Sequence, residues 1–399
     1  MIKLVCVTSN NNNKYYYMED LNNGTFKVTY GRVGSSETTL TYPICDWNKK
    51  YNEKIKKGYV DITEKIATVQ KTNEINIADS DVKELIKFLM NCAKQSIKRD
   101  YEISAEAITQ EQLQEVQELI DCINTLVLPK VDVIGEDKDI SSHITCDYNL
   151  INKYLQSIYS IIPRKMEDTR RYFLNKFDLQ FILELLQKEQ QRLDTLRSQV
   201  SISNTKTDIT LKSLGFECEL ASEEDKKLIK KMTDFKLTDH KVFKITNPTT
   251  ESVFNPNKLQ TKLLYHGSKN ENFLSILQTG LKIRPKGVAT TGSMFGNGIY
   301  AANKARKSIG YTSLKGSYWA SGHSDRAYLA IFEFATGKEY EVLKKEKYSY
   351  WMGNLDKQKV NDKGYDSVFA QGGVDLRNDE YIVYDSNQCT IRYLIELRG

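Results

Sequence analysis

The hydrophobic pattern of this 399-residue chain changes twice, near residues 76 and 203. The first and third stretches hold short β-type runs bounded by turn formers, whereas the second repeats apolar residues at helical spacing. A chain of this length usually holds two or three domains. We therefore expect a multidomain protein with a small β-rich module over 1–76, an all-α domain over 77–203 and an α+β domain over 204–399.

The first stretch contains short Tyr, Val and Thr runs, which predict strands over Lys14–Tyr17 and Thr25–Tyr30. We interpret the asparagine run 10–13 as a solvated loop between strands. A basic segment follows, made of Trp47, Lys49, Lys50, Tyr51, Lys54, Lys56, Lys57 and Tyr59. Two readings stay open for it: a solvated surface, or a face on which lysines meet phosphates and aromatic rings stack on bases.

The second stretch predicts long amphipathic helices and carries no cluster of reactive side chains. Asp81 with Glu84, and Thr109 with Gln112, have the spacing of helix-capping boxes. The apolar stripes comprise Val82, Leu85, Ile86 and Leu89; Leu113, Val116, Ile120 and Ile123; and Leu179, Ile182, Leu186, Leu193 and Leu196. We expect a helical core here, so any role of this domain is architectural or regulatory.

Composition argues against several classes of protein. The chain has no run of about 18 apolar residues, so we expect no membrane span. Its seven cysteines are scattered and form no CxxC pair, which argues against a disulfide framework and a cysteine zinc site. The net charge of +5 permits nucleic-acid binding without requiring it.

The third stretch predicts strands over Lys262–His266, Leu329–Phe334, Tyr381–Tyr384 and Thr390–Glu396, mostly not parallel. We expect the last two strands to form a hairpin-like return. Asn303 is expected to cap a short helix that ends at Gly310. Neither a GxGxxG after a strand nor a P-loop occurs, so a nucleotide would not be held in the Rossmann or Walker manner.

Three segments of this stretch occur in a telling order: His266-Gly267-Ser268, then Gly298-Ile299-Tyr300 with Lys307, Ser308 and Tyr311, then Glu380 at the start of an apolar strand. Together they closely resemble the catalytic domain of poly(ADP-ribose) polymerases, with the triad His266, Tyr300 and Glu380 complete. Tyr30-Gly31-Arg32 resembles the WGR DNA-binding module, and Tyr159–Pro163 resembles the signature of the family's helical regulatory domain. The order of the three parts is similar to that of the short, DNA-dependent members.

The resemblance implies NAD as the substrate and no metal. Tyr311 and Tyr300 would enclose the nicotinamide ring, while Gly267 and Ser308 would bond its carboxamide. His266 and Ser268 would position the adenine-side ribose, and Glu380 would bond the 2′-hydroxyl of the other ribose and stabilise the departing cation. The implied NAD contacts are His266, Gly267, Ser268, Lys282, Tyr300, Lys307, Ser308 and Tyr311, and the implied DNA contacts are Tyr30 and Arg32.

The sequence departs from the family pattern at four places. Tyr30 replaces the usual WGR tryptophan, and Lys282 stands where an adenosine-contacting arginine is usual, with loss of planar stacking. Asn297 replaces a common lysine, and Lys344–Leu376 is shorter than the loop that helps to shape the acceptor site. Acceptor choice and product length therefore do not follow from the resemblance.

The function implied is a DNA-break-stimulated protein ADP-ribosyltransferase of the DNA damage response. Its partners would be 5′-phosphorylated DNA nicks or ends and acceptor proteins that include itself, with no membrane. Elongation to poly(ADP-ribose) is permitted in principle. The alternatives are transfer of single units only, or a DNA-end scaffold with little transferase activity. In a eukaryotic host we expect a nuclear location, and otherwise a cytoplasmic one.

Overall fold

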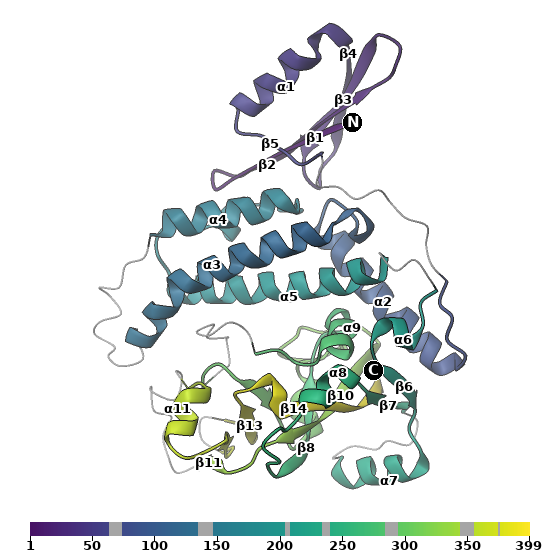
Figure 1. The fold of residues 1–399 in the computed structure, drawn as a ribbon, viewed down its shortest axis with the longest axis vertical. Helices are drawn as coiled ribbons and strands as arrows, with labels where there is room; N and C mark the ends of the chain where they lie inside the picture. The colour runs from purple at the N-terminus through teal and green to yellow at the C-terminus, as the bar shows by residue number, and fades with distance from the viewer. Residues whose placement is uncertain are drawn as a thin grey trace. The chain divides into compact units, whose positions relative to one another are not determined.

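The computed structural model describes residues 1–63, 74–134, 147–203, 208–233, 240–283, 294–343, 355–373 and 376–399. The chain forms two compact units, and Figure 1 labels most of their helices and strands. The first comprises Met1–Lys71, Lys94–Val127 and His143–Asn204, and the second comprises Thr72–Ala93, Leu128–Ser142 and Thr205–Gly399. Helices α2 and α3 thus contribute residues to both units. The division into three domains stays a prediction.

The first unit begins with an antiparallel five-stranded sheet of order β4-β3-β2-β1-β5. The predicted strands over Lys14–Tyr17 and Thr25–Tyr30 are confirmed within β2 and β3. Helix α1 packs on this sheet: its Trp47 meets Phe26 of β3 edge-on, with ring centroids 5.1 Å apart. The elements are β1 (Ile2–Thr8), β2 (Asn12–Asp20), β3 (Thr25–Arg32), β4 (Glu37–Pro43), η1 (Ile44–Asp46), α1 (Trp47–Lys56) and β5 (Val60–Asp61).

The asparagine run is only partly a loop, so our interpretation of it was wrong in its second half. Asn11 adopts a positive φ of 60° in the turn between β1 and β2, a conformation that asparagine tolerates. Asn13 lies within β2 and is fully buried. Its Nδ2 donates to the carbonyl of Arg164 at 2.7 Å, which gives the buried amide nitrogen a partner.

Long helices follow the sheet, with the apolar stripes buried as predicted; the side chain of Leu179 lies outside the described residues. The Thr109–Gln112 capping box is confirmed, since each residue's side chain bonds the other's backbone N–H. The box predicted at Asp81 and Glu84 is wrong: the Asp79 carboxylate accepts from the first N–H groups of the helix instead. The elements are α2 (Ser80–Asp100), η3 (Ala105–Ala107), α3 (Gln110–Ile134), α4 (Tyr148–Ile161), η5 (Thr169–Tyr172) and α5 (Leu179–Ser203).

The second unit contains two sheets with mostly antiparallel pairing and several helices, which is the α+β structure that we predicted. One sheet has five strands in the order β6-β7-β14-β10-β8, and the other has four in the order β11-β12-β13-β9, where only β11 and β12 are parallel among the described strands. The strands are β6 (Glu217–Leu220), β7 (Val242–Thr246), β8 (Thr261–Gly267), β9 (Ile299–Ala301), β10 (Arg326–Ala335), β11 (Glu339–Val342), β12 (Ser367–Ala370), β13 (Glu380–Val383) and β14 (Cys389–Arg398).

The expected hairpin near the C-terminus is wrong. β13 and β14 belong to different sheets, and the turn η7 (Ser386–Gln388) carries the chain from one to the other. The helices are α6 (Leu211–Leu214), α7 (Glu223–Met232), α8 (Pro248–Val253), α9 (Asn270–Thr279), α10 (Ala305–Ile309) and α11 (Lys357–Asp362). Within the described ranges, none of the chain's helices has both the length and the apolar character needed to cross a bilayer.

Candidate active site

The predicted catalytic residues come from three strands at the junction of the two sheets in the second unit. Tyr265 in β8 exchanges backbone hydrogen bonds with Ala302, just after β9, at 2.8 and 3.0 Å. β9 in turn pairs with β13, where Ile382 lies opposite Tyr300. This topology brings His266, Tyr300 and Glu380 together, although they are far apart in the sequence.

His266 is held as a neutral ring with a defined tautomer. Its Nδ1 lies 2.9 Å from the Tyr300 carbonyl oxygen, which can only accept, so Nδ1 carries the proton and Nε2 is left as an acceptor. The ring packs edge-on against Phe332, with centroids 6.0 Å apart. Burial lowers the pKa of His266 from its ordinary value of 6.5, which favours this neutral form.

The Tyr300 hydroxyl is fixed by the loop that precedes its strand. It donates to the carbonyl of Gly296 at 2.8 Å and accepts from the N–H of Phe295 at 3.0 Å. Gly298 allows β9 to lie tightly against β13, since a Cβ there would meet the side chain of Ile382 at 2.4 Å. The ring is thereby oriented by backbone contacts.

Glu380 is buried and only half paired. Its Oε1 forms an ion pair with the ammonium of Lys307, while its Oε2 has no hydrogen-bond partner within the described part of the chain. Burial lowers the pKa of Lys307, and the carboxylate beside it opposes that shift. A buried carboxylate oxygen without a partner is costly, so this atom is a strong candidate for contact with a ligand.

Gly267 and Ser308 lie in direct contact and form a cradle next to Tyr311. A Cβ at Gly267 would lie 1.8 Å from the Ser308 carbonyl oxygen and 3.2 Å from the Cβ of Tyr311, so no other residue fits here. The Ser308 hydroxyl donates to the Tyr265 carbonyl at 3.0 Å, which leaves its lone pairs as acceptors. Tyr311 follows α10 and remains 39% exposed; its burial and the Glu380 charge raise its pKa.

The remaining predicted residues of the second unit are placed less centrally. Ser268 follows β8, and its hydroxyl accepts from Asn272 at 3.1 Å. Lys282 is exposed, and no hydrogen bond or ion pair joins it to the other predicted NAD residues within the described ranges. The segment Lys344–Leu376, which differs from the family pattern, falls partly outside those ranges, at 344–354 and 374–375.

Sequence reasoning missed two features of this site. Asn303 does not cap α10: its amide donates to the Asp379 carboxylate at 2.9 Å and ties the start of α10 to the residue before Glu380, while Lys304 takes the cap position. Gly310 ends the helix as predicted. The ion pair between Lys307 and Glu380 was also missed, because nothing local in the sequence relates residues 73 positions apart.

The two predicted DNA-contacting residues lie in the first unit, and both make internal contacts. The Tyr30 ring faces Tyr16, and the Lys54 ammonium lies 5.9 Å from its centroid. Arg32 donates to Asn11 at 2.8 Å and to the carbonyls of Met166 and Glu167 at 3.2 and 2.7 Å. Arg32 therefore joins the sheet to the segment after α4.

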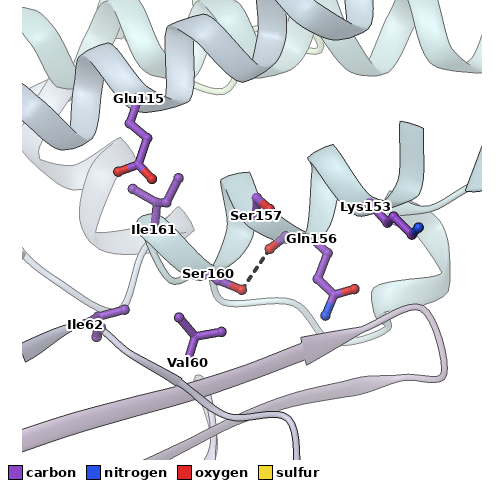
Figure 2. Close-up of a pocket in the computed structure, with 8 residues that line it drawn as sticks. All are labelled: Val60, Ile62, Glu115, Lys153, Gln156, Ser157, Ser160 and Ile161. Atoms are coloured by element: carbon purple, nitrogen blue, oxygen red, sulfur yellow. Dashed lines mark hydrogen bonds between the residues drawn. The ribbon is translucent and has the colours of Figure 1, made fainter. Parts of the chain in front are cut away.

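A cavity of about 310 Å³ lies elsewhere in the first unit (Figure 2). Figure 2 shows Val60 and Ile62 on one side of it and side chains of α4 on the other, with the Ser160 hydroxyl bonded to the Gln156 carbonyl at 2.8 Å. None of the predicted NAD residues contributes to it, so we separate it from the candidate site. Its lining residues are Val60, Ile62, Glu115, Lys153, Gln156, Ser157, Ser160 and Ile161.

Comparisons with known proteins agree with the geometry of the second unit. The family model described as the poly(ADP-ribose) polymerase catalytic domain matches residues 222–399. Poly [ADP-ribose] polymerase-like 100L of Invertebrate iridescent virus 6 is 32% identical over 169 residues, which cover 41% of this chain and 85% of that protein. Protein 101L of the same virus is 31% identical over 198 residues, or 50% of this chain and 76% of 101L.

A longer relative matches over a similar span. The Poly [ADP-ribose] polymerase of Drosophila melanogaster is 34% identical over 182 residues, which cover 42% of this chain and 18% of the insect protein. Within the described ranges, no group of three or more His, Cys, Asp or Glu side chains is arranged to hold a metal ion. The chain belongs to the poly(ADP-ribose) polymerase family and is an NAD⁺ ADP-ribosyltransferase.

Proposed function

We propose that this chain transfers ADP-ribose from NAD⁺ to protein acceptors, itself included, with release of nicotinamide, and that contact with a DNA break stimulates the reaction. The same site would extend an attached unit into poly(ADP-ribose). The observation that carries this proposal is the buried, half-paired carboxylate of Glu380 beside His266 and Tyr300. We place the protein in the DNA damage response, in the nucleus of a eukaryotic host.

The nicotinamide half of the substrate fits the cradle next to Tyr311. The Ser308 hydroxyl, whose proton is engaged by Tyr265, would accept from the carboxamide NH₂, while the Gly267 backbone would bond the same group. Tyr311 would stack on the flat ring, and Tyr300 would close its other side. A ring held in this way leaves the glycosidic carbon in a fixed position.

His266 and Glu380 would act on the two riboses. The Nε2 of the neutral His266 would accept from a hydroxyl of the adenine-side ribose and orient the dinucleotide, with Ser268 nearby. The open Oε2 of Glu380 would accept from the 2′-hydroxyl of the nicotinamide ribose and stabilise the oxocarbenium-like cation as nicotinamide leaves. The same carboxylate would then polarise an acceptor hydroxyl as a general base.

Lys307 would hold the carboxylate in place through the other oxygen. A single lysine on Oε1 supplies a counter-charge to the buried carboxylate and leaves Oε2 open. Lys282 would contribute only charge on the adenosine side, because an exposed lysine lacks the planar fork of arginine.

The N-terminal sheet would engage DNA as a WGR-type module, with Tyr30 and Arg32 at the contact. Arg32 links the sheet to the carbonyls of Met166 and Glu167, so a change in its surroundings on DNA binding would reach the helical segment. Lysines held over tyrosine rings, such as Lys50 over Tyr42 at 4.5 Å, would supply the phosphate contacts.

Labelled NAD⁺ tests the proposal directly when the full chain is incubated with and without nicked 5′-phosphorylated DNA. We expect labelled protein and a ladder of products, with more label when DNA is present. No transfer under either condition would contradict the enzymatic role of the site. Equal transfer with and without DNA would contradict the stimulation alone.

A further inference from the structure

An exposed aromatic cluster adjoins Tyr311 and has no role in the site described so far. Trp319 is 62% exposed and Tyr318 is 76% exposed. The Trp319 ring lies nearly parallel to that of Tyr311, at 15° with centroids 6.1 Å apart, and Tyr318 stands perpendicular to Trp319 with centroids 4.8 Å apart. Gathered, exposed aromatic side chains of this kind mark interaction sites. We call Tyr318 and Trp319 the aromatic platform.

The backbone fixes the aromatic platform against the end of α10. The N–H groups of Trp319 and Ala320 both donate to the Gly310 carbonyl, at 3.0 and 3.1 Å. The hydroxyl of Ser317, which is buried, donates to the Ile309 carbonyl at 3.0 Å. The backbone that carries the two exposed rings is therefore fixed before any ligand arrives, which lowers the entropic cost of binding.

The charge around the platform suits a nucleotide. Residues 304–320 contain no Asp or Glu, and besides Lys307, which is paired with Glu380, they hold three cationic side chains: Lys304, Arg306 and Lys315. Aromatic faces together with cations and without carboxylates are the combination that binds a base and its phosphates. A purely apolar partner would not need the cations.

The position of the platform narrows the choice of nucleotide. The same helix, α10, carries Lys307, which is paired with Glu380, and leads into Tyr311. In the proposed function Tyr311 already takes the nicotinamide of the donor, so a second flat ring next to it belongs to the acceptor. The proposed reaction attaches an ADP-ribose unit to the acceptor, so the acceptor of the next transfer carries an adenine and a pyrophosphate.

We propose that the aromatic platform stacks the adenine of an attached ADP-ribose unit and holds it as the acceptor for the next transfer. This inference rests on the proposed function. In that step an acceptor ribose hydroxyl oxygen bonds to C1′ of the donor ribose while the C1′–nicotinamide bond breaks. Nicotinamide leaves with the electron pair, and the hydroxyl proton passes to Glu380.

Equilibrium binding of a labelled ADP-ribose oligomer to the full chain, with saturating nicotinamide present, tests the platform. The double variant Tyr318→Ala/Trp319→Ala is expected to weaken binding about 5- to 150-fold, the range for loss of base stacking. Trp319→Phe should recover most of the affinity because it keeps a stacking face. Leu228→Ala, at an exposed position in α7, is the matched control and should leave the affinity unchanged.

If the double variant binds the oligomer within about twofold of the parent's affinity, the proposal is overturned, because loss of a base stack would weaken binding more than that. A loss seen only with a single-stranded oligodeoxynucleotide would also overturn it, in favour of a nucleic-acid surface. Thermal melting of each variant shows whether it is folded. If the parent adds only single units to itself, elongation in the proposed function fails, while the binding measurement still decides on the platform.

The product ladder gives a second, independent readout. In automodification with labelled NAD⁺, the double variant should give shorter chains and a lower ratio of transferred to free ADP-ribose than the parent and Leu228→Ala. An unchanged ratio and chain length would count against the aromatic platform as an acceptor site.

Discussion

Two buried glutamates, one in each unit, are paired with cations in different ways. In the first unit Glu189 has cations at both oxygens: Oε1 accepts from Arg164 at 2.6 Å and from Arg192 at 3.0 Å, and Oε2 makes an ion-pair contact with the other guanidinium nitrogen of Arg164, although it has no hydrogen-bond partner within the described ranges. In the second unit Glu380 has Lys307 on Oε1, and its Oε2 has no partner within the described ranges.

This difference is what we expect between a structural carboxylate and the catalytic carboxylate that we propose at Glu380. The bidentate pair of Glu189 and Arg164 satisfies two buried charges, and Tyr101 adds a further bond to the same guanidinium at 3.1 Å. The Oε2 of Glu380 lacks such a counterion, and in the proposed function it would bind a substrate hydroxyl. Proteins accept an unsatisfied buried polar atom mainly where function requires it.

The largest expected effect is on the fold. Glu189→Gln should lower the free energy of unfolding by about 3–5 kcal/mol, because it leaves the buried Arg164 charge without its counterion. Denaturant titration measures the change. Glu223→Gln, which removes an 80% exposed partner of Lys226, is the control and should cost at most about 0.5 kcal/mol. Equal, small effects of both substitutions would contradict the structural role of Glu189.

The second largest expected effect is a loss of activity when the proposed nicotinamide cradle is changed. Gly267→Ala should reduce kcat/KM for NAD⁺ about 100-fold, because the new methyl group would collide with the Ser308 carbonyl and displace the cradle by a fraction of an ångström or more. Gly364→Ala is the control: Gly364 has a positive φ, so the variant should lose some stability, but its new methyl group would meet nothing within 4 Å and its kinetics should be unchanged. Parent-like kinetics of Gly267→Ala would rule out this cradle.

A smaller effect is expected at the link between the N-terminal sheet and the helices. Arg32→Ala should reduce the DNA-stimulated to unstimulated rate ratio by about fivefold or more, because it breaks the contacts to Met166 and Glu167. Arg170→Ala removes a 69% exposed arginine that pairs with Asp168 and should keep the ratio. A ratio that is unchanged in Arg32→Ala would show that stimulation takes another route.

The smallest effect concerns the protonation of His266. Since burial lowers its pKa, the neutral form that keeps Nε2 as an acceptor should persist below pH 6.5, and the folded state should lose this contribution only as the pH falls from that value. The chain has four histidines, so NMR titration can follow each ring, with His266→Asn identifying the signal. A His266 pKa at or above 6.5 would contradict the account.

The strands around the site could be predicted from local alternation, and so could the cap formed by Thr109 and Gln112, because these patterns depend on neighbours in the sequence. The burial of Asn13 could not be predicted, since its hydrogen-bond partner is the Arg164 carbonyl, 151 positions away in the sequence. The hairpin expected after Tyr384 failed for a similar reason: a turn signal does not say which sheet receives the next strand.

The candidate site shows the same limit. The triad was predicted from motif order, but the ion pair of Lys307 with Glu380 and the tie between Asn303 and Asp379 arise only when β9 and β13 lie side by side. The aromatic platform left a weak local signal, two adjacent aromatic residues in a segment rich in glycine and serine. Only the structure shows that both side chains are exposed, and that exposure is what indicates an interaction site.

The catalytic role of the half-paired carboxylate can be tested most directly with Glu380→Gln. The full chain and this variant are incubated with labelled NAD⁺ and nicked DNA, and the products are resolved by length alongside free nicotinamide. The account predicts that the variant loses the ladder of long products and keeps some NAD⁺ cleavage, because the amide still fills the space but cannot take the acceptor proton. A ladder equal to that of the parent would contradict it.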